Sequence, residues 1–427
     1  MQKGTGCIFF VFDDDKKYYL CLAVKTDHMP KISQVGQKMP ASPIRKLVPY
    51  AEEAKRRGVH VYHLNIGQPD IPTPDEALAA IRATDVRTIA YTHSAGIESY
   101  REALAQFYTR RGLSVTAEEI IVTTGGSEAI VMAMMAVCDR GDQIIVPEPY
   151  YANYNGFAAE AGVEIVPVRS WIENDFALPP IADFEQLITD RTRAILICNP
   201  NNPTGYLYSE AEILQLRDMV RKHDLFLMAD EVYSDFCYNG AKHHSVLALD
   251  GMDEYVIMMD SISKRFSMCG ARVGALVSRN REVIDAALRM GQARLCAPYV
   301  GQRAAEAALH TPQSYFTAVH DEYQARRDYM IGALNRMEGV RCPMPRGAFY
   351  AIAQLPVDDA DRFAQWMLEH FEYKGRTVMV APASGFYAQP ESGRNQVRLA
   401  YVLNIDDLRA AMETLEMALK SYPGRTV

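Results

Sequence analysis

Residues 120–128 read Ile-Ile-Val-Thr-Thr-Gly-Gly-Ser-Glu, a short apolar run that leads through two glycines into an apolar stretch. The apolar run predicts a buried strand, and we expect a helix to begin at Ser127. Two glycines allow the backbone to approach a ligand closely, and the start of a helix presents N–H groups without partners, so the stretch suits an anion such as phosphate. The alternative is a tight strand-to-helix turn with Ser127 as the N-cap.

Pairs of a short apolar run and a helical stretch recur along the chain. Short apolar runs that predict strands lie at 143–146, 164–168, 194–198, 225–229 and 256–259, with helical stretches between most of them. Such alternation predicts a largely parallel sheet between helices. After about residue 310, helices are expected at 315–335, 361–371 and 406–419, and strands at 348–353, 378–381 and 397–401. These elements predict a second, smaller α+β unit.

Composition narrows the function classes. The 427 residues are 48% hydrophobic and 23% charged, as in ordinary globular proteins. The formal net charge is −8 and basic residues occur at most in pairs, so neither a nucleic acid nor an anionic membrane surface is an expected partner. The apolar run 129–138 is too short to cross a bilayer, and we expect it to be a buried helix.

Cysteine usage and the N-terminus bear on location. The eight cysteines are scattered without a C-x-x-C pair, which favours free thiols in a reducing cytoplasm, and no metal site is expected. Residues 1–28 hold two apolar runs around a charged turn and no secretory signal. They form either a hairpin or an extension ahead of Met29 that contributes nothing to function.

Residues that follow the predicted strands carry the candidate chemistry, because ligands of open α/β sheets bind beyond the carboxyl ends of strands. The loop 199–205 holds two prolines that fix its amides. Asp230 ends a buried strand and needs a cation or a hydrogen-bond donor, or it caps a helix. Lys264 follows the next strand, and the alternative is a lysine on a surface loop. Arg398 lies within an apolar strand, where it suits either a substrate carboxylate or an internal salt bridge.

The order and intervals of these motifs resemble the class I and II aminotransferases, fold-type-I pyridoxal-phosphate enzymes similar to aspartate aminotransferase. The resemblance runs from about Pro43 to the C-terminus. The matching positions are Leu64 to Asp70 with Thr73-Pro74, Tyr91 with Ala95-Gly96 and Arg101, Asn202 to Gly205, Asp230 to Tyr233, Ser261, Ser263 and Lys264 with Gly270, Arg272 and Gly274, Gly347 to Tyr350, and Val397 to Leu399.

The resemblance implies a role for each matched residue. Lys264 would hold pyridoxal 5′-phosphate as a Schiff base and move a proton, with Asp230 on the pyridine nitrogen and Tyr233 and Asn202 on the ring oxygen. Tyr151 would cover the cofactor ring. The residues implied to bind the phosphate are Gly125, Gly126, Ser127, Ser261, Ser263 and Arg272, joined by Tyr91 of a neighbouring subunit. The residues implied to bind substrate are Gly67, Asn202 and Arg398.

The implied activity is that of an aminotransferase (EC 2.6.1.-) in amino acid metabolism, including biosynthesis. It would move an amino group from an L-amino acid, with aspartate or glutamate the first choice, to a 2-oxo acid such as 2-oxoglutarate by a ping-pong mechanism, in a homodimer. Where aspartate-specific relatives carry an arginine of the partner chain for the second carboxylate, this sequence has Gln292, with Arg294 two residues on, so either of the two could contact the substrate side chain. A lyase or other eliminating enzyme on the same fold, and a cofactor-binding regulator without activity, are the alternatives.

The expected organisation is an N-terminal extension (1–28), an N-terminal segment that packs with the small domain (29–60), a large cofactor-binding domain (61–310) and a small C-terminal domain (311–427).

Overall fold

The computed structural model describes residues 30–427, and the chain divides into two units, residues 1–39 and 40–427. The first unit contributes α1 (Gln34–Lys38), and everything that follows concerns the second unit. The hairpin expected within residues 1–28 lies outside the described residues.

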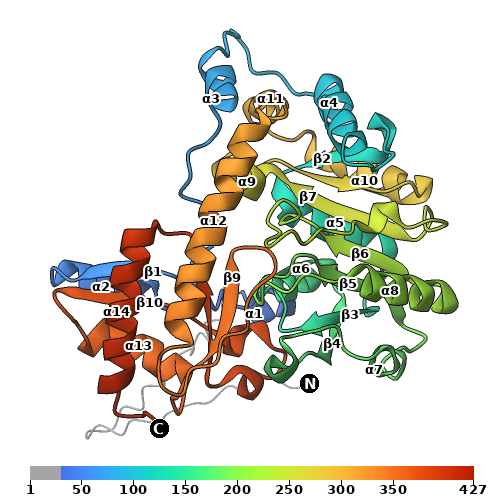
Figure 1. Cartoon of the computed structure of the whole chain (residues 1–427). Helices are drawn as coiled ribbons and strands as arrows, with labels where there is room; N and C mark the ends of the chain where they lie inside the picture. Colours follow the sequence, from blue (N-terminus) through green and yellow to red (C-terminus); the bar gives the residue numbers. More distant parts are fainter. Residues whose placement is uncertain (1–29) are drawn as a thin grey trace, which may run out of the picture. The chain divides into compact units, whose positions relative to one another are not determined.

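A seven-stranded sheet is the centre of the unit (Figure 1), with strand order β2-β8-β7-β6-β5-β3-β4. Neighbouring strands from β7 to β4 pair in parallel, whereas β8 runs antiparallel to both β2 and β7. This confirms the largely parallel sheet and adds the unpredicted strand β8. The strands are β2 (Ile120–Thr123), β3 (Gln143–Glu148), β4 (Glu164–Arg169), β5 (Thr192–Cys198), β6 (Phe226–Asp230), β7 (Val256–Ser261) and β8 (Gly274–Val277).

Helices cover both faces of this sheet. Successive side chains of a strand point to opposite faces, so a strand that is apolar throughout needs helices on both sides. Ile144 and Val146 of β3 join a core with α5 (Gly125–Val137), α6 (Tyr154–Ala161) and α10 (Arg281–Arg294). Ile145, between them, joins a second core on the other face. That core includes residues of α4 (Glu98–Thr109), α7 (Ile181–Glu185), α8 (Glu210–His223) and α11 (Tyr299–Ala308).

A second group of strands comes from the C-terminal part of the chain and from one early segment. β9 (Tyr350–Gln354) and β11 (Ala381–Pro382) flank β12 (Gln396–Ala400) in an antiparallel sheet. β10 (Arg376–Met379) pairs in parallel with β1 (His60–His63). The single strand expected at 378–381 is therefore wrong: the chain leaves one sheet after Met379 and enters the other at Ala381, because each segment finds a different partner.

Helices of this part begin and end close to the expected residues. The expected helices at 315–335, 361–371 and 406–419 correspond to α12 (Gln313–Leu334), α13 (Ala360–His370) and α14 (Ile405–Ser421). Side chains of Asp359 and Asn404 cap α13 and α14, which sets the two N-termini. The remaining α-helices of this unit are α2 (Val48–Arg56), α3 (Asp75–Arg82) and α9 (Ile262–Arg265).

The early segment is tied to the C-terminal part of the chain. Arg57, just after α2, donates to the carbonyl of Leu368 in α13 at 2.7 Å. The domain boundaries at 60/61 and 310/311 stay predictions. No helix within residues 30–427 combines the length and the apolar composition needed to cross a membrane.

Candidate active site

A cavity of about 720 Å³ lies at the carboxyl ends of strands β2, β5, β6 and β7. Parallel strands deliver the residues that follow them to one edge of the sheet, so segments far apart in sequence meet there. The predicted site residues that line this cavity are Gly67, Gly126, Ser127, Tyr151, Asn202, Asp230, Tyr233, Ser261, Ser263, Lys264, Arg272 and Arg398.

Lys264 lies on the short helix α9, which follows β7 directly. Ser261 caps this helix by accepting the Ser263 N–H at 3.1 Å, so the chain turns sharply and the lysine points into the cavity. Its Nζ donates to the carbonyl oxygen of Gly67 at 2.8 Å and lies 3.8 Å from Cys269 Sγ. The surface-loop alternative is wrong, because the amine is half-buried and faces the other site residues.

Asp230, the last residue of β6, is a buried carboxylate without a cationic partner within residues 30–427. Only 4% of the residue is exposed, and no lysine, arginine or histidine there lies within ion-pair distance of it. Tyr154 Oη donates to Oδ2 at 2.9 Å, and the Val232 N–H lies 3.4 Å from Oδ1. Burial raises the pKa of Asp230 to about 6, and the hydrogen bond from Tyr154 opposes that rise. A cation in the cavity would therefore be stabilised beside this group.

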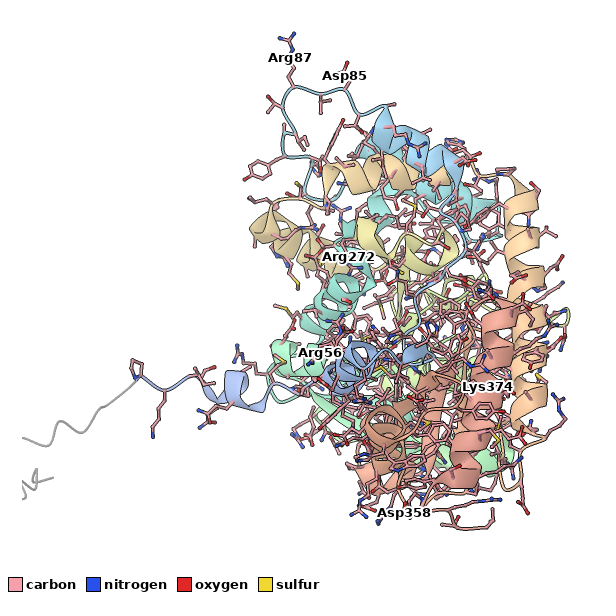
Figure 2. All side chains as sticks on the ribbon, turned by 90° about the vertical axis from the view of Figure 1, so that its left-hand side faces the viewer. Arg56, Asp85, Arg87, Arg272, Asp358 and Lys374 are labelled. Carbon is pink, nitrogen blue, oxygen red and sulfur yellow. The ribbon has the colours of Figure 1, made fainter. Side chains whose placement is uncertain are left out.

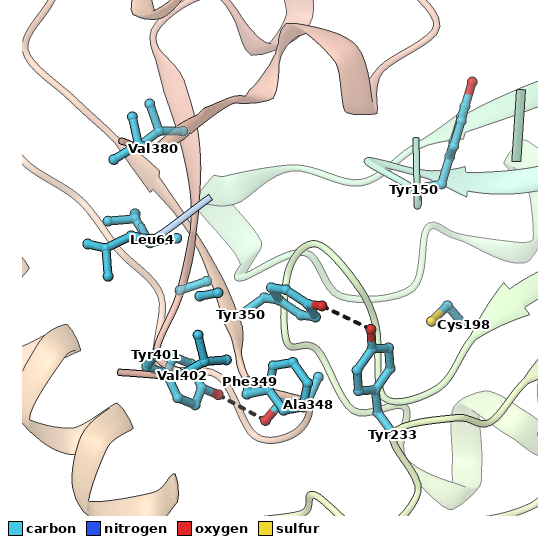
Figure 3. Close-up of a cluster of buried hydrophobic side chains, with 14 of the residues drawn as sticks. Leu64, Tyr150, Cys198, Tyr233, Ala348, Phe349, Tyr350, Val380, Tyr401 and Val402 are labelled. Carbon is cyan, nitrogen blue, oxygen red and sulfur yellow. Dashed lines mark hydrogen bonds between the residues drawn. The ribbon is translucent and has the colours of Figure 1, made fainter. Parts of the chain in front are cut away.

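Tyr233 and Asn202 lie close together in the lining of the cavity. Asn202 Nδ2 lies 3.5 Å from Tyr233 Oη, which in turn lies 3.0 Å from Tyr350 Oη (Figure 3). Burial raises the pKa of Tyr233 well above its ordinary value, which keeps the hydroxyl protonated as a donor. Tyr151 lines a wall, and Asn153 donates to its hydroxyl at 2.8 Å.

Arg398 is a buried cation in β12 with 1% of the residue exposed. Its Nη1 donates to Asn202 Oδ1 at 3.1 Å and its Nη2 to the Asn65 carbonyl, while Nε has no partner in the described chain. Burial lowers the pKa of the guanidinium. No carboxylate within residues 30–427 pairs with Arg398, so the alternative of an internal salt bridge is wrong and the charge is available to a ligand.

The predicted phosphate site lies at the start of α5. This helix begins at Gly125, so the expected start and N-cap at Ser127 are wrong. Gly125 has φ 78°, and a Cβ there would lie 2.5 Å from Arg272 Nη2, so the position accepts no side chain. Because glycine disfavours helix, the sequence predicted a later start, whereas the paired glycines form the first turn of α5. The guanidinium (labelled in Figure 2), Ser127 and the N–H groups of that turn offer donors to an anion.

Two predicted residues do not line the cavity. Gly125 lies behind Arg272, and Tyr91 has 78% of its surface exposed. The expectation that Tyr91 reaches the site of a second subunit stays a prediction. Of the two candidates for the substrate side chain, Arg294 pairs with Glu128 at 2.8 Å and Gln292 is exposed. Neither lines the cavity of this chain.

Sequence reasoning missed Tyr154 as the partner of Asp230 and Tyr350 as the partner of Tyr233. Tyr154 lies three residues after Tyr151, a spacing that could have suggested a shared face. Tyr350 lies within the motif at 347–350 that carried the resemblance, but no local pattern assigns it to the cavity.

Comparison with known proteins decides the family. The sequence pattern of the family described as "Aminotransferase class I and II" matches residues 59–415. The chain belongs to this family. The aromatic-amino-acid aminotransferase 2 of Thermococcus litoralis is 32% identical to this aminotransferase over 388 residues, which cover 89% of this chain and 96% of the relative.

Solved structures agree with the fold. The aspartate aminotransferase of Thermus thermophilus with maleate has a TM-score of 0.82 and 31% identity, covering 92% of this chain and 100% of that one. The alanine aminotransferase of Pyrococcus furiosus has a TM-score of 0.85 and 30% identity, with coverage of 92% and 100%. The fold-type-I architecture and the aminotransferase activity predicted from sequence are thereby confirmed.

The family's cofactor, pyridoxal 5′-phosphate, fits this cavity. A buried carboxylate can pair with its protonated pyridine nitrogen, an amine can react with its aldehyde, and a cluster of hydrogen-bond donors can bind its phosphate. Asp230 is a buried carboxylate without a cationic partner in residues 30–427, Lys264 supplies the amine, and the start of α5 with Arg272 supplies the donors.

Proposed function

We propose that this aminotransferase takes its amino group from aspartate or glutamate and passes it to 2-oxoglutarate by a ping-pong mechanism. Amino-group transfer itself follows from the family. The observation that carries the proposal is the presence around one cavity of Lys264, Asp230 and Arg398, whose charge has no carboxylate partner in the part of the chain that the structure describes. Arg398 suits the α-carboxylate that every amino donor carries. The solved relative from Thermus is named as an aspartate aminotransferase with maleate, a dicarboxylate, which supports a dicarboxylic donor.

Lys264 is the proposed catalytic base and the anchor of the cofactor. When bound, pyridoxal phosphate supplies an electron-accepting ring. Lys264 Nζ, within 2.8 Å of the Gly67 carbonyl, holds a position from which it can take the proton of the substrate Cα and return it on the cofactor side. The carbonyl accepts a hydrogen bond from the amine, which restricts the direction of the amine.

Asp230, Tyr233 and Asn202 are proposed to set the charge of the ring. Asp230 would hold a proton on the ring nitrogen, where the positive charge removes the cost of burying the carboxylate. Tyr154 orients that carboxylate through its hydrogen bond of 2.9 Å. Tyr233 Oη and Asn202 Nδ2 would donate to the ring oxygen.

The remaining predicted residues are proposed to bind and orient. Gly126, Ser127, Ser261, Ser263 and Arg272 would hold the phosphate, with Gly125 leaving room for the arginine. Tyr151 would cover the ring face.

Substrate is proposed to bind through Arg398, with Asn202 and the Gly67 backbone beside it. Asn202 accepts from Arg398 Nη1 at 3.1 Å, which holds the guanidinium plane in one orientation. A Cβ on Gly67 would lie 1.6 Å from Tyr350 Oη, so the backbone can approach the site only as glycine.

A homodimer with shared sites is proposed, in which Tyr91 reaches the phosphate of the partner. The connection between α3 and α4, with Asp85 and Arg87 at its tip, extends outward from the helices beside it (Figure 2). Tyr91 lies on this connection and is 78% exposed, as an arm to a second chain requires. Mixing two inactive variants, Tyr91→Ala and Lys264→Ala, should restore activity to one site of each hybrid dimer.

The proposed setting is the cytoplasm, in amino acid metabolism and biosynthesis. The described cysteines are free thiols, which a reducing compartment favours. We keep the proposed large domain at 61–310 and the small domain at 311–427, which places Arg398 and Lys264 on different domains.

An absorption experiment tests the proposed function. The holoenzyme receives single amino acids without a 2-oxo acid, and its near-ultraviolet and visible spectrum is followed. We expect aspartate or glutamate to bleach the yellow band to the amine form of the cofactor, with Lys264→Ala as the inactive control. A yellow band that persists while pyruvate or ammonia accumulates would assign the chain to a lyase instead.

A further inference from the structure

Within residues 30–427, four basic side chains line the cavity, and the proposed function uses three of them. Lys264 is the proposed base, Arg272 faces the phosphate donors, and Arg398 faces the α-carboxylate. The fourth is Arg45, which precedes α2. A dicarboxylic donor brings a second carboxylate that these three groups leave without a cation.

Arg45 is free to bind a ligand. Its side chain is exposed at the cavity, and within residues 30–427 it forms no ion pair and no side-chain hydrogen bond. Its neighbour Lys46 instead pairs with Asp361 on the surface and does not line the cavity. The two adjacent cations therefore face different surroundings.

The backbone that carries Arg45 is held in place. Asn65 Nδ2 donates to the carbonyl of Ile44 at 3.3 Å, and the Val48 N–H donates to the Arg45 carbonyl at 3.0 Å. Leu47 is 4% exposed and anchors the segment in the core. Asn65 also accepts from Arg398 through its carbonyl, so one residue contacts both Arg398 and the segment that carries Arg45.

The other candidates for a second carboxylate are committed elsewhere or carry no charge. Arg294 pairs with Glu128 at 2.8 Å and donates to the carbonyls of Ser94 and Val122 at 3.2 Å. Gln292 has no charge, and an uncharged amide binds a carboxylate more weakly than a guanidinium does.

We propose that Arg45 binds the side-chain carboxylate of a dicarboxylic amino acid, and so determines the preference for such donors. The proposal rests on the proposed function, because it needs Arg398 to hold the α-carboxylate. It places the specificity residue on the same chain as Lys264, in the segment ahead of α2.

The test compares two ligands of equal length by calorimetric titration of the holoenzyme. Succinate has two carboxylates, and butyrate has a methyl group in place of one of them. We expect Arg45→Met to weaken succinate binding about tenfold and to change butyrate binding less than about twofold, since only succinate reaches the guanidinium. Lys46→Met is the matched control, with both affinities unchanged.

Donor selectivity gives a second measurement. In Arg45→Met, kcat/KM for aspartate or glutamate should fall about tenfold relative to kcat/KM for alanine. An equal loss for all donors, or no loss, would overturn the role of Arg45. If none of the amino donors converts the cofactor of the unaltered holoenzyme to its amine form, the proposed function itself is wrong. That result differs from an active Arg45→Met variant whose donor selectivity is unchanged, which would overturn only the role of Arg45.

Discussion

Replacing Asp230 with asparagine should stabilise the cofactor-free protein and at the same time impair turnover. The carboxylate is buried, and Tyr154 is its side-chain donor in the described chain. Without a cation beside it, its charge destabilises the fold. Asparagine removes the charge and keeps a similar shape, and its side-chain oxygen can still accept from Tyr154.

The size of the stabilisation follows from the pKa. Burial raises the pKa of Asp230 from 3.8 to about 6. Between these values the unfolded chain has lost its proton while the folded chain keeps it, so stability falls as the pH rises through this window. The difference corresponds to about 3 kcal/mol above pH 6, and about half of it is already present near pH 5.

The assay is urea unfolding of the cofactor-free protein, followed by the fluorescence of Trp171 and Trp366. We expect Asp230→Asn to be more stable than the unaltered protein by about 1–3 kcal/mol near pH 8, and by about 1.5 kcal/mol less near pH 5. The pH dependence of this stability difference is a stricter test than its size at one pH. Any weakening of the Tyr154 hydrogen bond in the variant adds a contribution that does not depend on pH in this range.

Asp235, a partly buried aspartate that has cationic partners, provides the control. Although burial raises the pKa of Asp235, the guanidinium groups of Arg265 and Arg111 hold it well below its ordinary value. Asp235→Asn should therefore destabilise the protein near pH 8. If Asp230→Asn also destabilises the cofactor-free protein near pH 8, the reasoning about its uncompensated charge is refuted.

Turnover should respond in the opposite sense. With cofactor bound, Asp230→Asn removes the charge that keeps the ring nitrogen protonated, and we expect kcat to fall about 10²- to 10³-fold. The absorption band of the bound cofactor should remain, since Lys264 and the phosphate donors are unchanged. A variant with nearly full kcat would contradict the role of Asp230.

Other predictions concern Lys264 as the residue that binds the cofactor, Gly67 beside it, and Arg294, which we exclude from substrate binding. Borohydride reduction should attach the cofactor to the peptide that contains Lys264, and mass spectrometry that finds it on another residue would contradict the assignment. Gly67→Ala should raise KM for the donor about tenfold, since its Cβ would lie 1.6 Å from Tyr350 Oη, and truncating Tyr350 as well should recover part of this loss in steady-state kinetics. Arg294→Ala should lower stability by about 1–2 kcal/mol by leaving the partly buried Glu128 unpaired, with the donor preference unchanged; an altered preference in kcat/KM would refute our exclusion of Arg294.

The local sequence pattern was sufficient to predict those site residues that come directly after a strand. Asp230 and Lys264 could be predicted because each follows an apolar run that reads as a strand, and ligands of open α/β sheets bind beyond the carboxyl ends of strands. The start of α5 was misplaced because glycine disfavours helix, so the sequence gives no local signal that the helix begins at Gly125. Strand β8 was missed because Gly-Ala-Leu-Val contains only one β-branched residue, whereas the equally short β2 reads Ile-Ile-Val-Thr, in which every residue favours a strand.

Order and spacing along the chain are enough to predict the alternation of strands and helices, the family and the residues that follow the strands. Which of these residues share a cavity, and which already have ion-pair partners, becomes evident in the folded arrangement. Arg294 is bound to Glu128, whereas Arg398 and Arg45 have no carboxylate partner within residues 30–427. Ion pairing depends on distances between segments far apart in sequence, and folding alone establishes those distances.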